Sequence, residues 1–169
     1  MLLLEVEGMK QPKNKKKKVL FIASLGGHLT QLLQLKPLFE EYDYHIVTEK
    51  SVITEALRKE YKMSFLVYGA RNYLFRYIFK FSLNIILSLY YFFREKPDVI
   101  VTTGAHTSVP MCYIAKLFGK KVVFIESFAK TTTPTISGKL VYPVADLFII
   151  QWETMKKHYP KAVYGGSIY

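Results

Sequence analysis

Short apolar runs alternate along the chain with longer segments in which apolar residues recur every three or four positions. Continuous apolar runs are typical of parallel strands, which are buried on both faces, whereas the longer segments predict amphipathic helices. Strands are expected at 19–23, 44–48, 64–68, 97–102, 121–125, 146–150 and 162–164. Helices are expected at 28–41, with a kink or break at Pro37, at 52–61 and at 72–94. Further helices are expected from the turn at 103–110 to about 118, at 139–144 and at 151–159. This rhythm predicts an α/β fold, a Rossmann-like parallel sheet with right-handed crossovers and helices on both faces.

The length of the chain bounds its organisation. With 169 residues it has the size of one ordinary domain, and a second full domain does not fit. We expect a basic tail over 1–17, followed by a single domain over 18–169. Met9 offers a simpler start to the chain, which would make residues 1–8 a start-site overcall. The single cysteine, Cys112, leaves no internal disulfide and fits a reducing compartment.

The segment 24–31 joins the first predicted strand to the first predicted helix and contains Gly26, Gly27 and His28. Two glycines at such a turn let the backbone bend sharply and approach a ligand closely, and the free N–H groups of the next helix favour an anion. We therefore expect a phosphate at this turn. The alternative is a tight βα turn without a ligand, in which His28 is only a polar residue of the first helical turn.

Two further polar segments follow predicted strands. Residues 103–110 form a second small-residue turn before a helix, and Glu126 comes directly after the strand at 121–125. Because the carboxyl ends of parallel strands meet at one edge of a sheet, we expect both segments near the first glycine turn. The additional candidate binding residues are Gly104, His106, Thr107, Ser108, Glu126 and Ser127.

A histidine at such an edge can accept a proton from a hydroxyl or hydrogen-bond a phosphate oxygen, and the sequence leaves both roles open for His28 and His106. Other chemistries lack their residues. The sequence has no Walker loop, zinc-ligand spacing or Gly-x-Ser-x-Gly elbow, so neither a metal nor a cofactor is expected. Glu49 is placed as in dinucleotide-binding folds, but a third glycine near Gln31 is missing. A nicotinamide-dependent dehydrogenase is therefore an unfavoured alternative.

Residues 72–94 form a long and strongly apolar segment. As a helix, it gathers its few polar residues, which recur every four positions from Arg76 to Ser88, into one narrow stripe. The remaining circumference is wider than a face that packs on a sheet requires, so we favour a helix that lies in a membrane surface. The alternatives are a buried core helix and, least favoured, a transmembrane span with its basic residues in hydrocarbon. The residues expected at the membrane are Arg76, Phe79, Lys80, Ile86, Tyr90 and Phe93.

The formal net charge is +11, and part of it is concentrated before the first strand. In an aromatic-rich chain such a run favours anionic lipid headgroups over nucleic acid, and a solvated tail is the alternative. We therefore expect a membrane surface as a partner, and no nucleic acid. The lysines expected at the membrane are Lys15, Lys16, Lys17 and Lys18.

Several short motifs occur in a specific order along the chain. They are Gly26-Gly27-His28, Thr103-Gly104-Ala105-His106 through Pro110, Glu126 through Gly138, Ala145-Asp146, and Tyr164 through Ser167. Together these motifs resemble the Alg14-like family over nearly the whole chain. The members of that family are membrane-associated companion subunits of split GT-B glycosyltransferases, including those of bacterial capsule and exopolysaccharide assembly. The resemblance implies that this chain is the N-terminal, acceptor-side half of a GT-B enzyme, at the cytoplasmic face of the cell membrane.

The resemblance also implies partners. An Alg13-like catalytic subunit would carry most of the nucleotide-sugar site, so this chain would be inactive or weakly active alone. Its glycine turns would help to bind an undecaprenyl-diphosphate-linked saccharide, and the transferred sugar would be galactose from UDP-galactose, in β-1,4 linkage. Two departures from the similar transferase of peptidoglycan synthesis affect the acceptor contacts: the second loop has the single glycine Gly104, and Ile125 stands where that enzyme has a histidine. An independent membrane-docked α/β scaffold is the alternative function.

Overall fold

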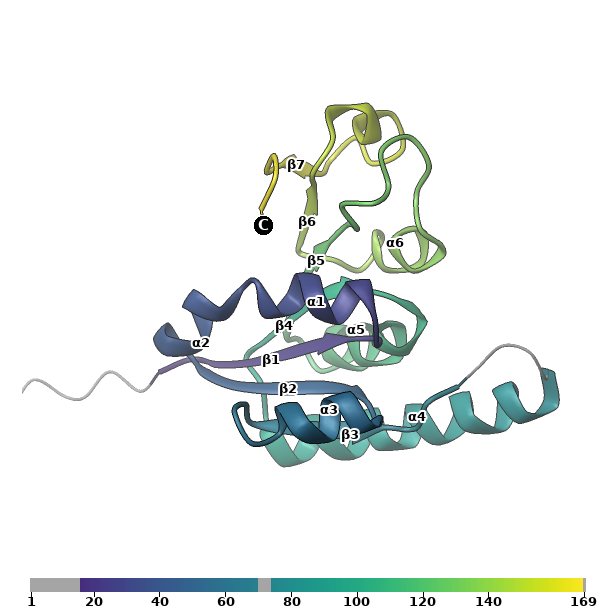
Figure 1. Ribbon diagram of the computed structural model, residues 1–169. Helices are drawn as coiled ribbons and strands as arrows, with labels where there is room; N and C mark the ends of the chain where they lie inside the picture. Colours follow the sequence, from purple (N-terminus) through teal and green to yellow (C-terminus); the bar gives the residue numbers. More distant parts are fainter. Residues whose placement is uncertain (1–15, 70–73, 169) are drawn as a thin grey trace, which may run out of the picture.

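The computed structural model describes residues 16–69 and 74–168 of the chain. Its centre is a seven-stranded parallel sheet with the strand order β3-β2-β1-β4-β5-β6-β7, which confirms the predicted parallel fold (Figure 1). The direction of winding reverses between β1 and β4, as in doubly wound α/β folds. The strands are β1 (Lys18–Ala23), β2 (Asp43–Glu49), β3 (Met63–Leu66), β4 (Val99–Gly104), β5 (Lys121–Ile125), β6 (Leu147–Ile150) and β7 (Val163–Tyr164).

The helices lie between the strands, and several differ from the prediction in their bounds or type; the helix predicted at 52–61, for example, ends at Leu57. In the helix predicted over 28–41, the predicted break occurs at Leu35, where a second helix begins. Pro37 lies in the first turn of that second helix, where the backbone N–H that proline lacks would have no partner within the helix. The helix predicted at 139–144 begins earlier, where the Thr135 side chain accepts a hydrogen bond from the Gly138 N–H and caps it. The segment 151–159 contains a 3-10 helix instead of an α-helix. The helices are α1 (Gly27–Leu33), α2 (Lys36–Glu41), α3 (Val52–Leu57), α4 (Leu74–Glu95), η1 (His106–Ser108), α5 (Val109–Leu117), α6 (Ile136–Val141) and η2 (Glu153–Lys157).

Both faces of the sheet are covered. Right-handed connections place α1, α2 and α3 on one face and α4, α5 and α6 on the other, because the crossovers from β1 to β3 and from β3 onwards run in opposite directions. Alternate residues of β1 accordingly enter two separate apolar clusters: Leu20 and Ile22 pack with α4 and α5, and Val19 and Phe21 with α1 and α2. Burial on both faces explains why β1 reads as a continuous apolar run.

The polar stripe of α4 faces the protein. Asn84, which is 2% exposed, accepts a hydrogen bond from the Val67 N–H at 2.8 Å and donates one to the Val67 carbonyl at 2.9 Å. Lys80 Nζ donates to the Tyr68 carbonyl at 3.0 Å, and Ser88 is fully buried. These contacts tie α4 to the segment that follows β3. The stripe that sequence analysis found is therefore a docking surface within the domain.

The opposite face of α4 is apolar and exposed, so the buried-core alternative is wrong for this face. Figure 1 shows α4 extending past the carboxyl ends of the strands. The side chain of Arg76 and all of residues 1–15, including Lys15, lie outside the described residues. Within the described part of the chain, no helix combines the length and apolar character needed to cross a membrane. Four of the residues predicted to lie at the membrane are exposed: Phe79 (74% of its surface), Ile86 (63%), Tyr90 (55%) and Phe93 (51%).

Candidate functional site

The loops after β1, β2, β3 and β4 surround one open cleft at the carboxyl edge of the sheet. Its volume is about 680 Å³, within the range of pockets that bind small molecules. Of the predicted site residues, Gly26, His28 and His106 line this cleft. The full lining consists of Ser24, Leu25, Gly26, His28, Glu49, Lys50, Ser51, Tyr68, Gly69, Ala105 and His106.

The backbone of the first turn requires a glycine at position 26. Gly26 has a φ of +82°, a left-handed conformation that side-chain-bearing residues disfavour. A Cβ added at Gly26 or Gly27 would meet nothing within 4 Å, so the two glycines serve conformation and access, and not close packing. Gly27 begins α1, which is only seven residues long. The phosphate expected at this turn stays a prediction.

His28 is fixed against the end of β4. Its Nδ1 lies 2.7 Å from the Thr103 carbonyl oxygen, and the Thr103 hydroxyl donates to the His28 carbonyl, also at 2.7 Å. Because a carbonyl only accepts, the hydrogen of the neutral ring is on Nδ1 and the lone pair on Nε2. Gly104, with a φ of +98°, gives the ring room, since a Cβ there would lie 3.1 Å from His28 Cε1. His28 thus brings a hydrogen-bond acceptor to the cleft.

A buried carboxylate lies beside the second histidine. Glu49 is 2% exposed, its Oε2 accepts a hydrogen bond from the Leu25 N–H at 3.0 Å, and its Oε1 lies 4.0 Å from His106 Nε2. Within residues 16–69 and 74–168, Oε1 has no hydrogen-bond partner. Burial raises the pKa of Glu49, and the backbone N–H groups of Leu25 and Gly69 partly offset that rise. In the cleft, His106 therefore lies beside the Glu49 carboxyl group, one oxygen of which lacks a hydrogen-bond donor.

Thr107 and Ser108 lie beneath the cleft and do not line it. The Thr107 hydroxyl forms a hydrogen bond with the Ser24 hydroxyl, and the Ser108 hydroxyl donates to the Ala105 carbonyl at 2.7 Å. Both residues are fully buried. Thr107 joins the loops after β1 and β4, and Ser108 closes the loop after β4 on itself, so direct contact with an acceptor would require these bonds to be replaced.

Glu126 belongs to a separate network after β5. It is 1% exposed and accepts hydrogen bonds from the Thr135 hydroxyl (2.8 Å), the Tyr159 hydroxyl (2.8 Å) and the Ser127 N–H (2.9 Å). Gly138 packs so closely that a Cβ there would lie 2.3 Å from Glu126 Oε2. This carboxylate fixes the polar loop that follows β5. Neither Glu126 nor Ser127 lines the cleft, although both follow a strand at the predicted edge.

Three lining residues with polar side chains were not singled out from the sequence. Lys50 forms an ion pair with Glu55 at 3.1 Å, Ser51 caps α3 by accepting the Thr54 N–H at 3.1 Å, and Tyr68 is 51% exposed. All three follow β2 or β3, and the same edge rule that was applied to β1 and β4 would have found them.

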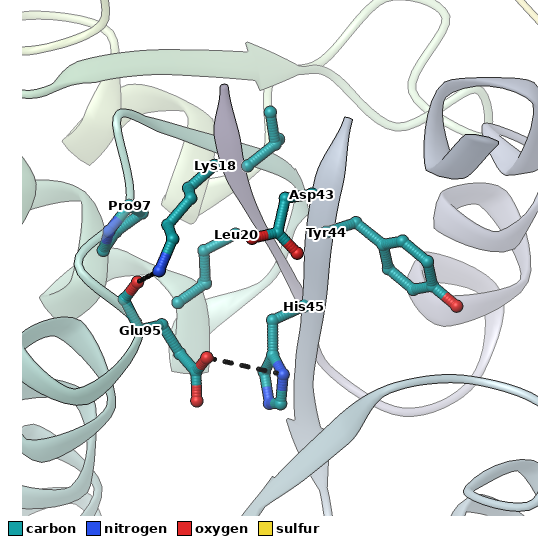
Figure 2. Close-up of a pocket in the computed structure, with 8 residues that line it drawn as sticks. Lys18, Leu20, Asp43, Tyr44, His45, Glu95 and Pro97 are labelled. Carbon is teal, nitrogen blue, oxygen red and sulfur yellow. Dashed lines mark hydrogen bonds and ion pairs between the residues drawn. The ribbon is translucent and has the colours of Figure 1, made fainter. Parts of the chain in front are cut away.

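A second cavity lies at the opposite, amino edge of the sheet (Figure 2). Its volume of about 30 Å³ suits a water molecule and not a ligand. Figure 2 shows the contacts there: His45 Nδ1 lies 3.7 Å from Glu95 Oε2, and Lys18 Nζ lies 3.4 Å from the Glu95 carbonyl. Burial lowers the pKa of His45. This cluster attaches the end of α4 to β1 and β2, and leaves Lys16 and Lys17 exposed beside it.

Residues 69–168 match the family model described as oligosaccharide biosynthesis protein Alg14 like. The match covers more than half of the chain. The chain belongs to the Alg14-like family. The matched range includes the loop after β4, Glu126 and the segment 164–167 of this Alg14-like chain, but the turn at Gly26–His28 precedes it.

Curated relatives carry a consistent name. The Alg14-like chain is 44% identical over 81 residues to the UDP-N-acetylglucosamine transferase subunit ALG14 of Rattus norvegicus, a match to 44% of this chain and 38% of that protein. It is 40% identical over 77 residues to the same subunit of Schizosaccharomyces pombe, covering 43% of this chain and 37% of that protein. The matches thus span less than two-fifths of the length of these relatives.

Solved structures agree with the predicted fold. MurG from Acinetobacter baumannii superposes with a TM-score of 0.67 at 16% identity, over 82% of this chain and 42% of that chain. The UDP-N-acetylglucosamine 2-epimerase from Rickettsia bellii gives 0.67 at 17% identity, over 86% and 41%. At these identities the similarity shows the fold alone, and it confirms the Rossmann-like α/β prediction.

Proposed function

We propose that this Alg14-like chain is the acceptor-side subunit of a two-component glycosyltransferase. The family match over residues 69–168 carries the proposal, because the curated relatives are named as subunits of a transferase. The partner is an Alg13-like catalytic subunit that holds most of the nucleotide-sugar site. This chain alone has little or no transferase activity.

The chemistry of the cleft suits this role. In sugar transfer, the acceptor hydroxyl oxygen bonds to the anomeric carbon, the bond from that carbon to the nucleotide diphosphate breaks, and the hydroxyl proton leaves. His28 can take that proton, since the Thr103 carbonyl holds the hydrogen of the neutral ring on Nδ1 and leaves Nε2 as an acceptor. The solvent-exposed side of the cleft, near Lys50, accommodates the rest of the acceptor.

A membrane surface binds the exposed face of α4 in this proposal. Exposed apolar patches of this kind mark interaction sites. The patch continues onto α5, because the ring centroids of Phe93 and Phe118 lie 5.1 Å apart and Leu117 is 80% exposed. The lysines at 15–18 add attraction to anionic headgroups at the cytoplasmic face, about 1 kcal/mol for each basic residue near the surface.

The acceptor is an undecaprenyl-diphosphate-linked saccharide of bacterial capsule or exopolysaccharide assembly, and the donor is UDP-galactose, which yields a β-1,4 linkage. These choices rest on the family resemblance of the sequence. The names of the curated relatives make UDP-N-acetylglucosamine the second donor to test.

The decisive experiment reconstitutes the chain in vesicles with the lipid-linked acceptor, with and without an Alg13-like chain from the same genome. Transfer from either UDP-sugar is expected only when both chains are present. Full transfer by this chain alone contradicts the proposal. Full transfer by the Alg13-like chain without this one favours the independent scaffold, and retention of this chain on a nicotinamide resin favours the dehydrogenase.

A further inference from the structure

The cleft contains one buried charge whose hydrogen bonds are incomplete. Glu49 Oε2 accepts a hydrogen bond from the Leu25 N–H at 3.0 Å, and the Gly69 N–H also interacts with this carboxylate, so turning the group to exchange its two oxygens would cost the Leu25 bond. Oε1 has no hydrogen-bond partner within the described residues. A buried carboxylate oxygen without a donor is costly, so such an atom in a native structure requires an explanation.

The group placed to compensate this charge is His106. Its Nε2 lies 4.0 Å from Glu49 Oε1, which is too long for a hydrogen bond but within the range of an ion pair. Burial raises the pKa of Glu49, and a cation at this distance acts in the opposite direction, because it favours the ionised carboxylate. Both side chains line the cleft, but the His106 side chain is 22% exposed and that of Glu49 only 3%.

We propose that Glu49 is a positioning residue that holds the His106 imidazole in its protonated form, so that His106 presents a cation to a diphosphate in the cleft. The diphosphate is that of the lipid-linked acceptor, and this assignment rests on the proposed function. A buried carboxylate close to an imidazole stabilises the imidazolium through its opposite charge, even without a hydrogen bond. The two histidines then differ in role: His28, whose Nδ1 lies against a carbonyl, offers Nε2 as an acceptor, and His106, backed by a carboxylate, becomes a charged donor.

Among the described residues, the other charged groups around the cleft do not duplicate this effect. Lys50 is paired with Glu55 at 3.1 Å, and Lys80 Nζ donates to the Tyr68 carbonyl. His28 and the Tyr68 hydroxyl are the remaining titratable groups of the cleft lining. On the α4 side, the neutral ring of Phe81 faces His106, with 6.4 Å between the ring centroids. Glu49 is thus the buried anion that acts on His106.

The test compares the folded chain with its Glu49→Gln variant. Glutamine keeps an acceptor for the Leu25 and Gly69 N–H groups but removes the charge. In NMR titrations of the imidazole signals, we expect the pKa of His106 to fall by about one unit in Glu49→Gln, a tenfold loss of proton affinity, while that of His28 is unchanged. Glu55→Gln is the matched control, because Glu55 is an exposed carboxylate that pairs with Lys50 of the cleft lining. Glu55→Gln should leave the pKa of His106 unchanged.

Binding of inorganic pyrophosphate to the chain alone supplies the second measurement. Near neutral pH, Glu49→Gln should weaken this binding about three- to tenfold, and in a His106→Asn background the Glu49 substitution should have no further effect.

Geranyl diphosphate and UDP distinguish the source of the diphosphate. The Glu49 substitution should weaken the binding of geranyl diphosphate and not that of UDP. An unchanged His106 pKa, or unchanged pyrophosphate affinity, overturns the inference. An effect confined to UDP overturns the acceptor assignment. Because neither measurement involves sugar transfer, a reconstituted complex that transfers no sugar would overturn the proposed function and leave this pair standing.

Discussion

At the scale of single residues, turnover is expected to depend most on His28. Alanine removes Nε2, the proton acceptor that the Thr103 hydrogen bond sets up. We expect kcat of the reconstituted complex to fall about 10²–10⁴-fold, the usual contribution of a general base, with a smaller change in KM for the acceptor. Steady-state measurements of sugar transfer over a range of acceptor concentrations test this.

His158→Ala is the matched control for that variant. His158 Nε2 also lies within hydrogen-bond distance of a backbone carbonyl, that of Thr132 at 2.9 Å, yet the residue is outside the cleft. Equal losses in the two variants would contradict a base role for His28. A rise in KM with kcat retained would instead make His28 a phosphate ligand.

Glu126 is expected to govern stability. Alanine leaves the hydroxyls of Thr135 and Tyr159 and the N–H of Ser127 without their acceptor, so the free energy of unfolding should fall by about 2–4 kcal/mol in chemical denaturation. Glu55→Ala, at an exposed carboxylate, should change it by less than about 0.5 kcal/mol. A loss in Glu126→Ala as small as that of the control would show that the network does not stabilise the loop.

Glu126 also shows what sequence reasoning can place and what it cannot. The edge rule located this residue correctly at the carboxyl end of β5. It could not show that the carboxylate turns under the following loop, because one of its partners, Tyr159, lies 33 positions further along the chain. The same rule found His28 and His106, but the incomplete hydrogen bonding of Glu49 depends on the folded positions of Leu25 and Gly69.

At the scale of elements, the strands could be predicted because burial on both sheet faces leaves a plain apolar run. The orientation of α4 could not. Polar residues every four positions mark one helix face, but they are equally compatible with solvent and with the polar end of a neighbouring strand. The position of β3 decides which way the polar face of α4 points, since Asn84 binds both the N–H and the carbonyl of Val67, directly after β3. The wide apolar face was therefore correctly identified from the sequence, whereas the partner of the polar stripe was not.

The exposed face of α4 should determine membrane binding. Phe79→Asp or Ile86→Asp removes one large apolar contact and adds an anion, so each should reduce flotation with anionic vesicles about tenfold or more. Val52→Asp is the control, since Val52 is 85% exposed on α3, at the other face of the sheet. Flotation at low and high salt separates this contribution from that of the lysines at 15–18. Equal flotation of all three variants and the native chain would contradict the assignment.

The far end of α4 should be sensitive to pH. The pKa of His45 lies below its ordinary value of 6.5, chiefly because the ring is buried, so its neutral form favours the folded state. That stability is complete above pH 6.5 and is lost as the pH falls below it, because the unfolded chain takes up the proton first. His45→Gln, which keeps an acceptor near Ser64, should flatten the decline of unfolding free energy between pH 7.5 and 5.5. An identical decline in the variant would exclude His45 as its cause.

At the scale of the whole molecule, the cleft and the apolar face meet along α4. Lys80 binds the carbonyl of Tyr68, which lines the cleft, and the ring of Phe81 faces His106 with 6.4 Å between centroids. A bilayer in contact with Phe79 would therefore lie beside the cleft mouth. An acceptor with a long lipid tail could then keep the tail in the bilayer while its diphosphate reaches the histidines.

This arrangement predicts that the membrane contact affects the acceptor and not the chemistry. In the reconstituted complex, Phe79→Asp should raise KM about tenfold for an acceptor held in vesicles by its full-length lipid, with kcat little changed. For a short-chain, water-soluble acceptor the same variant should behave like the native chain, because that substrate reaches the cleft from solution. Val52→Asp should leave KM unchanged for both acceptors. Equal losses with both acceptors would mean that Phe79 supports the cleft itself, and unchanged KM with both would mean that the apolar face serves another partner.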